Sequence, residues 1–413
     1  MSKSRRPRVL LVTRNLPPLV GGMERLNWHM ADELSRHADV RVVAPTGAAA
    51  SAPASLIVYE VPLNPLWKFL VKAQWVAWRV ARTWKADVVL AGSGLTAPAV
   101  WLASRGSDAL SAAYVHGLDL AAHHPVYRCL WRPALRHMNC VIANSRSTAA
   151  LAQDIGIEQR RIGIVNPGVD LPIDPTSSKC ETLEVGKYEG VPKDDRVQMD
   201  RLEFRKNYQL GNRPVLLSVG RLSTRKGLRE FVERALPRIA AVYPDVLLLV
   251  VGDEPKDALG AQAQSRESIQ AVAELSDLGA NLRFLGTITD YQVLGSIYLA
   301  ADVHVFPVRD IRGDPEGFGM VAVEAAAHGL PTVAFSTGGI VDAVAEGKSG
   351  HLVKSGDYLG FAQSVLRTLS ESEALRDSCQ VFAQKFAWSE FGREISGLLG
   401  VVDPDLDSPE NVA

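Results

Sequence analysis

DPEGFGMVAVEAAAHGLPTVA, residues 314–334, is the stretch that decides how this chain folds. It predicts a loop, a helix, a turn and a short strand, and residues 301–307 before it predict another short buried strand. Gly317 and Gly319 allow the backbone to turn tightly where the helix begins. The N–H groups and the positive dipole end at that helix N-terminus would suit a phosphate or another anion.

Two carboxylates, Glu316 and Glu324, lie eight positions apart in this stretch. On one helix that spacing places them on roughly the same side, with Glu316 at the mouth and Glu324 deeper. Taken singly, Glu316 could merely complement the helix dipole, and Glu324 could lie on a solvated face. Together with the Gly-Phe-Gly opening and the later Gly338-Gly339 pair, the two carboxylates form a more specific pattern.

This combination resembles the signature of two glutamates separated by seven residues in retaining glycosyltransferases of family 4. The resemblance runs over nearly the whole chain, from Gly21-Gly22 to Trp388. It implies an α/β protein of the GT-B fold, with two Rossmann-like domains whose parallel sheets face a deep cleft. The length of 413 residues independently predicts two domains. We expect an acceptor-side domain (1–170), a linker with a polar insertion (171–212), a nucleotide-sugar domain (213–385) and C-terminal helices packing back on the first domain (386–413).

The composition is that of a soluble globular protein, with 47% hydrophobic and 22% charged residues. The four cysteines are scattered without metal-ligand spacing, which favours reduced thiols in a cytoplasmic protein. Residues 9–13 form an apolar run too short for a signal peptide, and no uncharged apolar run reaches transmembrane length. We expect a cytoplasmic location and leave open peripheral attachment to the inner face of the cytoplasmic membrane.

The charge is distributed unevenly along the chain. Residues 1–165 contain 20 Lys and Arg against 10 Asp and Glu, whereas the remainder contains 25 against 36. A basic N-terminal half suggests an anionic partner, such as a phosphate-bearing acceptor or an anionic membrane surface. The sequence has no nucleic-acid-binding motif of a recognised kind, so we expect no nucleic-acid partner.

A helix predicted over residues 66–85 concentrates part of this charge. At helical spacing, Trp75 falls on one narrow stripe together with four basic residues: Lys68, Lys72, Arg79 and Arg82. A basic stripe that carries an aromatic is typical of an interfacial helix. The alternative is an ordinary helix packed on the sheet with a solvated basic face. The sequence leaves both interpretations open.

In the first half, the candidate ligand-binding residues follow predicted strands. The Gly21-Gly22 pair lies between a strand and a helix, an arrangement that can cradle a phosphate, although a plain strand–helix turn would look similar. His116 ends another strand, where ligands collect in parallel sheets. A lone histidine there is more often a core or capping residue. Its Val-His-Gly-Leu-Asp context resembles the family motif whose histidine contacts the donor sugar from the other domain, so catalysis would require closure.

In the second half, a buried strand is followed by Arg221 and Lys226, five positions apart at a glycine turn. Two such cations suit a diphosphate, although a solvated basic turn would carry them equally well. The segment resembles the Gly-Arg-Leu to Lys-Gly motif of family 4. In that family the backbone of the segment matching residues 281–287, which includes Leu285, holds the nucleotide base.

The resemblance implies transfer of a sugar from a nucleoside diphosphate sugar to a hydroxyl acceptor, lipid-linked or part of a glycan. No metal or other cofactor is expected, because fixed cations and helix N-termini would stabilise the leaving diphosphate. Glu316 would hold sugar hydroxyls, and Glu324 would hold the ribose. The expected catalytic residues are His116, Glu316, Arg221 and Lys226. The expected donor-binding residues are Gly21, Gly22, Arg221, Lys226, Leu285, Glu316, Gly317, Phe318, Gly319, Met320 and Glu324.

Two other functions stay open at this point. One is a different GT-B enzyme, such as an epimerase or a phosphorylase, although the acid/base pair or pyridoxal lysine that these need is not recognisable. The other is a non-catalytic nucleotide-sugar-binding protein. Residues 309–314 resemble an insertion in phosphatidylinositol mannosyltransferases, which suggests mannose as the sugar and a lipid as the acceptor.

Overall fold

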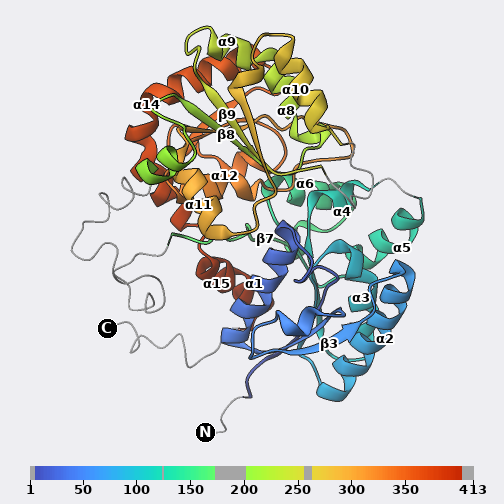
Figure 1. Ribbon diagram of the computed structural model, residues 1–413. Helices are drawn as coiled ribbons and strands as arrows, with labels where there is room; N and C mark the ends of the chain where they lie inside the picture. The colour runs from blue at the N-terminus through green and yellow to red at the C-terminus, as the bar shows by residue number, and fades with distance from the viewer. Residues whose placement is uncertain (1–4, 123–124, 173–200, 255–262, 402–413) are drawn as a thin grey trace, which may run out of the picture. The chain divides into compact units, whose positions relative to one another are not determined.

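The computed structural model describes residues 5–122, 125–172, 201–254 and 263–401 (Figure 1). Its contacts divide the chain into two compact units, which we describe separately. Unit 1 draws on Met1–Gly168, Arg312–Phe318 and Phe386–Ala413, and unit 2 on Val169–Ile311 and Gly319–Lys385. Residues 173–200, the larger part of the predicted linker with its polar insertion, lie outside the described residues, as do residues 402–413.

Unit 1 is built on a seven-stranded sheet in the order β3-β2-β1-β4-β5-β6-β7, with every neighbouring pair parallel. Its inner strands are apolar runs buried on both faces, as a parallel sheet between helices requires. The strands are β1 (Arg8–Val12), β2 (Asp39–Pro45), β3 (Ile57–Val61), β4 (Val88–Ala91), β5 (Leu110–Val115), β6 (Cys140–Ala143) and β7 (Ile162–Ile164).

Helices cover both faces of this sheet. One face packs on α2 (Leu66–Trp84), α3 (Ala97–Arg105), α5 (Pro125–Arg136) and α6 (Arg146–Asp154), whose apolar sides share one core. The other helices are α1 (Gly22–His37), α15 (Trp388–Leu399) and the short α4 (Gly117–Ala121), and α1 packs on α15. His29 of α1 stacks on Trp388 with ring centroids 3.9 Å apart, which ties the end of the chain to unit 1.

Unit 2 repeats this plan with a six-stranded parallel sheet in the order β10-β9-β8-β11-β12-β13. The strands are β8 (Val215–Val219), β9 (Leu247–Val251), β10 (Leu282–Gly286), β11 (Val303–Phe306), β12 (Thr332–Phe335) and β13 (Gly350–Val353). When the strands of each sheet are numbered from 1 in chain order, both sheets contain the order 3-2-1-4-5-6 of the doubly wound fold, and the sheet of unit 1 has a seventh strand after it. The predicted two α/β domains with parallel sheets are therefore confirmed.

The helices of unit 2 lie on two faces with separate apolar cores. One core includes α8 (Leu228–Arg234), α9 (Leu236–Ala240), α10 (Arg266–Glu274) and the first part of α14 (Tyr358–Gln384). The other includes α11 (Tyr291–Ala300) and α12 (Met320–Ala327), and the short α13 (Ile340–Ala343) follows β12. In both sheets the order reverses beside the first strand, and ligand sites of this fold lie at the carboxyl ends there.

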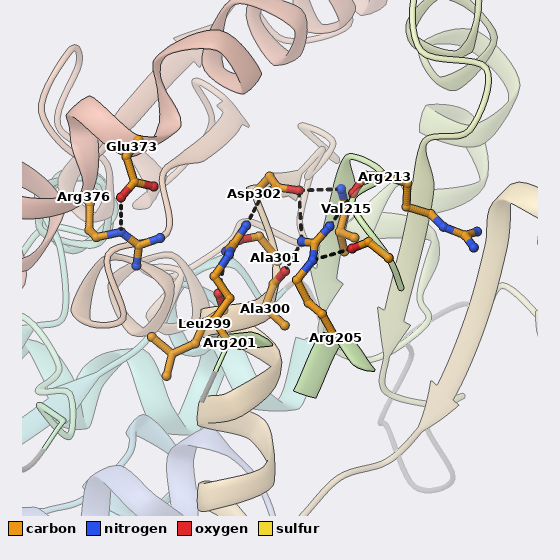
Figure 2. Close-up of polar contacts among 11 residues, drawn as sticks. Arg201, Arg205, Arg213, Val215, Leu299, Ala300, Ala301, Asp302, Glu373 and Arg376 are labelled. Atoms are coloured by element: carbon orange, nitrogen blue, oxygen red, sulfur yellow. Dashed lines mark hydrogen bonds and ion pairs between the residues drawn. The ribbon is translucent and has the colours of Figure 1, made fainter. Parts of the chain in front are cut away.

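A helical stretch at 201–207 precedes β8 in unit 2, and two arginines attach it to the rest of the unit (Figure 2). Arg201 and Arg205 donate to three consecutive carbonyls at the end of α11, residues 299–301, over 2.7–2.9 Å. Asp302 accepts from Arg201 at 2.5 Å and from the backbone N–H of Val215 at 2.7 Å. The arginines thus satisfy carbonyls that a helix end leaves without partners.

Candidate active site

In unit 1, His116 follows directly after β5, is half-buried and is the N-cap of α4. Asn144, directly after β6, donates from Nδ2 to His116 Nδ1 at 3.3 Å, so the imidazole carries its proton on Nε2. His116 Nε2 is buried and has no partner among the described residues. Burial lowers the pKa of His116, while Asp119 and Glu24 act against that shift. The ring is therefore a neutral hydrogen-bond donor near pH 7.

Carboxylates surround this histidine. Asp119 Oδ2 accepts from the backbone N–H groups of His116 and Gly94, both at 3.0 Å. Glu24, in the first turn of α1, accepts from Asn15 Nδ2 at 2.6 Å. These bonds fix both carboxylates at the carboxyl edge of the sheet, where they can accept bonds from hydroxyl groups.

The Gly21-Gly22 pair opens α1, with Gly21 as the N-cap and Gly22 as the first helical residue. A Cβ on Gly21 would lie 2.4 Å from Glu24 Oε2, so a larger residue there would displace this carboxylate from its present position. A negative charge thus already lies at the N-terminus of α1, where we expected a phosphate. The donor-binding role of the two glycines stays a prediction.

The Glu316 segment belongs to unit 1 by its contacts, which the sequence did not predict. A Cβ on Gly117 would lie 3.0 Å from the ring of Pro315, and a Cβ on Gly317 would lie 2.7 Å from Asn144 Nδ2. The Phe318 ring lies 5.6 Å from that of Phe386. These contacts bring Glu316 beside the strand ends that carry His116 and Asn144.

The prediction that one helix carries Glu316 and Glu324 on the same side is wrong. The helix α12 begins only at Met320, because its N-cap Gly319 has a φ of 99°, a left-handed conformation that ends regular backbone there. Glu316 therefore lies in the preceding loop. Helical spacing cannot relate its side chain to that of Glu324, which lies inside α12.

In unit 2, one aromatic ring organises the predicted phosphate site. A Cβ on Gly319 would lie 2.9 Å from Phe306 Cε1, so the N-terminus of α12 lies against that ring. Lys226 Nζ lies 4.6 Å from the centroid of the same ring. The sequence-predicted cation and the first N–H groups of α12, at Gly319 and Met320, are thus brought together around Phe306.

The loop that carries Arg221 and Lys226 follows β8 and is fastened at its far end. Gly227 has a φ of 68°, and a Cβ there would lie 2.2 Å from Pro307 O. The Arg309 N–H donates to Arg225 O at 2.8 Å, and its guanidinium pairs with Glu230 at 2.6 Å. Arg221 is exposed at the start of the loop. The loop geometry is thus fixed by the residues that follow β11.

Two further predicted residues lie at the edges of this arrangement. Leu285 falls at a bulge in β10, where the pairing with β9 shifts between Phe284 and Gly286. A bulged residue stands outside the regular ladder, which suits the predicted backbone contact with a base. Glu324 is partly buried on α12, and Tyr298 Oη donates to its Oε2 at 3.0 Å.

Sequence reasoning missed three of the polar side chains that complete these two sets. Tyr298 stands at a position of α11 where the sequence pattern predicts an apolar core residue. Only the packing of α11 and α12 in one core reveals its bond to Glu324. Asn144 and Glu24 were visible as polar residues at a strand end and a helix start, but neither belongs to a recognised motif. Their position at the carboxyl edge was the available signal.

Among the described residues, no group of three or more His, Cys, Asp or Glu side chains could hold a metal ion. The expectation that no metal is needed stays a prediction. None of the described helices combines the length and the apolar character that a membrane span requires.

Comparison with known proteins shows which family the chain belongs to. The family described as Glycosyltransferase Family 4 matches residues 20–172, and that described as Glycosyl transferases group 1 matches residues 213–371. A Mycolicibacterium smegmatis protein named GDP-mannose-dependent alpha-(1-6)-phosphatidylinositol monomannoside mannosyltransferase is 30% identical over 364 residues, covering 84% of this chain and 86% of that protein. A D-inositol 3-phosphate glycosyltransferase from Geodermatophilus obscurus is 32% identical over 256 residues, covering 60% and 49%.

The crystal structure of Anabaena Alr3699/HepE in complex with UDP is similar with a TM-score of 0.75 and 19% identity, over 96% of this chain and 100% of that one. This likeness concerns the fold, which is that of a GT-B protein. The chain therefore belongs to glycosyltransferase family 4 and is a glycosyltransferase that moves a sugar from a nucleotide-sugar donor.

Proposed function

We propose that the protein transfers mannose from GDP-mannose to a hydroxyl of an inositol-containing glycolipid while unit 1 lies on an anionic membrane surface. The donor and acceptor follow the name of the M. smegmatis relative. The observation that carries the lipid acceptor is the outer face of α2.

That face exposes large apolar side chains that a water-soluble helix would normally bury. Trp67 is 62% exposed, Val71 63%, Trp75 57% and Trp78 42%. Its opposite side, including Phe69 and four further residues, is fully or almost fully buried against the sheet. A helix with this distribution suits the boundary between water and lipid.

Basic side chains lie among these tryptophans. Lys68 lies 5.5 Å from the Trp67 ring centroid, Arg79 lies 5.5 Å from that of Trp75, and Arg82 lies 5.0 Å from that of Trp78. Such pairs keep each cation close to its aromatic ring, so the charged group and the ring would lie at the same depth in a membrane interface.

The surface continues onto α3, which packs along α2. Arg105 lies 4.2 Å from the Trp101 ring centroid, and Leu102 is 37% exposed. Each basic residue near an anionic surface contributes about 1 kcal/mol, screened by salt. Four of them on α2, with three interfacial tryptophans, support reversible peripheral binding.

For the donor, the chemistry of unit 2 supports diphosphate departure without a metal. Lys226, Arg221 and the N–H groups at the start of α12 would stabilise the negative charge that develops on the leaving group. Glu324 would accept bonds from ribose hydroxyls. From unit 1, His116 and Glu316 would hold sugar hydroxyls, His116 by donation from Nε2 and Glu316 by acceptance.

The test combines binding and turnover. Vesicles of phosphatidylcholine alone and with phosphatidylinositol monomannoside, an anionic inositol glycolipid, are sedimented with the protein, and mannose transfer from GDP-mannose to the vesicle lipid is measured. We expect binding and transfer only with the inositol glycolipid, both weakened by salt. Replacing Lys68, Lys72, Arg79 and Arg82 together by Gln should abolish vesicle binding and leave GDP binding unchanged.

A matched control removes the same charge from exposed lysines of unit 2, with Gln at Lys206, Lys348, Lys354 and Lys385. This control should bind vesicles like the parent protein. An equal loss of vesicle binding in both variants would show that binding depends on the net charge of the protein and not on the basic residues of α2. Transfer to soluble D-inositol 3-phosphate but not to vesicles would contradict the lipid acceptor.

A further inference from the structure

A buried tyrosine on α11 holds the side chain of Glu324 on α12. Tyr298 is 1% exposed, and its Oη donates to Glu324 Oε2 at 3.0 Å. A hydrogen bond to a charged oxygen is stronger than one between neutral groups. The phenol therefore restricts a long acidic side chain, which otherwise has several rotamers, to one direction.

The ring of Tyr298 is itself held by two histidines. His328 stacks on it with centroids 5.2 Å apart and an interplanar angle of 20°, and His304 meets it edge-on at 6.5 Å. His328 Nδ1 donates to the main-chain oxygen of Glu324 at 2.8 Å. A Cβ on Gly295 would lie 3.0 Å from His328 Nε2, so the glycine leaves space for this stack.

We infer that Tyr298 is a positioning residue that sets Glu324 for a ribose and gives the enzyme a preference for ribonucleotides over deoxyribonucleotides. The inference rests on the proposed donor-binding role of Glu324. A carboxylate oxygen has two lone pairs, so Oε2 can accept from Tyr298 and from a ligand hydroxyl together. A carboxylate fixed in advance loses less conformational freedom when two neighbouring ribose hydroxyls bind to it.

The experiment measures dissociation constants by calorimetry for GDP and UDP and for their 2′,3′-dideoxy counterparts, with the full chain. Tyr298→Phe removes one hydroxyl and keeps the stacked ring. Of GDP and UDP, we expect the one that the parent protein binds more tightly to lose about tenfold in affinity for the variant, the usual effect of losing a hydrogen bond to a charged group. The dideoxy compound should change less than twofold.

A double-mutant cycle separates positioning from a general effect on the fold. In a Glu324→Ala background, Tyr298→Phe should have no further effect on ribonucleotide affinity, because the carboxylate that it positions is gone. Tyr114→Phe is the matched control. Tyr114 is fully buried in unit 1, and its hydroxyl donates to Val165 O at 2.8 Å, so the control loses a comparable bond.

Equal weakening of GDP and dideoxy-GDP by Tyr298→Phe, or the same tenfold effect in the Glu324→Ala background, would overturn the inference. Should Tyr298→Phe unfold early, Gly295→Ala tests the same arrangement by displacing His328, and an unchanged ribose preference would count against it. A parent protein that binds neither GDP nor UDP would overturn the proposed donor, and this inference with it.

Discussion

The two units share one strand order but carry opposite chemistry at the carboxyl ends of their sheets. Unit 1 gathers two fixed carboxylates, Asp119 and Glu24, around a neutral histidine. Unit 2 gathers a lysine and a helix N-terminus around the Phe306 ring. The first set can exchange hydrogen bonds with hydroxyl groups, and the second can balance an anion. The residues at the strand ends, rather than the shared fold, therefore set the chemistry that each unit can offer to a ligand.

Two histidines, His304 of unit 2 and His116 of unit 1, show the same contrast. His304 lies within β11, donates or accepts at Thr332 Oγ1 over 3.0 Å, and is surrounded by core residues. His116 lies one residue beyond β5, among polar groups at the sheet edge. Both have a buried Nε2 without a partner among the described residues. Position along the strand distinguishes the candidate site histidine from the core histidine, which is also the more deeply buried residue of the two.

The largest expected effect removes the lysine of unit 2. Lys226→Ala should lower turnover by about 10²–10³, the usual loss when one group that stabilises a leaving anion is deleted. Its thermal unfolding should change little, because Lys226 is only partly buried. Lys206→Ala, an exposed lysine of the same unit, is the control. Steady-state kinetics that give a near-normal rate for Lys226→Ala would remove this residue from the diphosphate site.

A second prediction uses the core histidine of unit 2. Burial, with a smaller contribution from Lys226, lowers the pKa of His304 to about 3. In the unfolded chain a histidine has a pKa of about 6.5, so below that pH only the unfolded state takes up the proton. Stability should therefore fall as the pH falls from about 6.5 toward 3, by up to about 1.4 kcal/mol per pH unit from this residue.

Urea unfolding of the parent and of His304→Asn at pH 7 and pH 5 checks this expectation. The variant will be less stable at pH 7, but its loss between the two pH values should be smaller than that of the parent. Identical losses in the two proteins would assign the acid sensitivity to other groups, among them His116, whose pKa is also lowered by burial.

A third, smaller effect concerns the histidine of unit 1. His116→Ala should lower transfer about tenfold, the effect of losing one hydrogen bond to the substrate. Because burial lowers the pKa of His116 from its ordinary value, the ring is neutral at pH 7 and above, and the rate should not follow protonation of His116 between pH 7 and 8. A rate profile that falls with a midpoint near 6.5 in the parent, and is flat in His116→Ala, would contradict the neutral-donor role.

Much of the fold could be predicted from the sequence, because its strands are apolar runs that end in glycine or polar residues. The start of α12 could not be predicted. From the sequence alone, Gly319 and Met320 are compatible with a helix that begins earlier, and only the left-handed φ of Gly319 shows that it begins at Met320. A helix cap is easier to predict: Ser145 is a residue type that favours the N-cap position, and its Oγ accepts from the Thr148 N–H at 3.1 Å at the start of α6. Local chemistry thus indicates a cap but does not fix the helix boundary at Gly319.

The candidate site divides in the same way. His116, Lys226 and Glu324 could be identified because each stands in a recognisable local pattern. Tyr298 could not, because its partner is 26 positions away and on another helix. The contact of Pro315 with Gly117 likewise joins segments that are distant in sequence. These contacts arise from packing between segments far apart in the sequence, and the spacing of residues along the chain does not predict such packing.

The smallest expected effect is the response to metal removal, which tests the comparison between the units directly. If the cations of unit 2 stabilise the diphosphate, treatment with EDTA should leave the transfer rate unchanged, and Mg²⁺ or Mn²⁺ should not restore Lys226→Ala. In unit 1, Asp119 and Glu24 accept bonds from protein N–H groups, so binding a metal would require breaking these bonds. A rate that falls with EDTA and recovers with Mg²⁺ would show that a metal supplies the charge instead, and unit 1 carboxylates would then be the first ligands to replace.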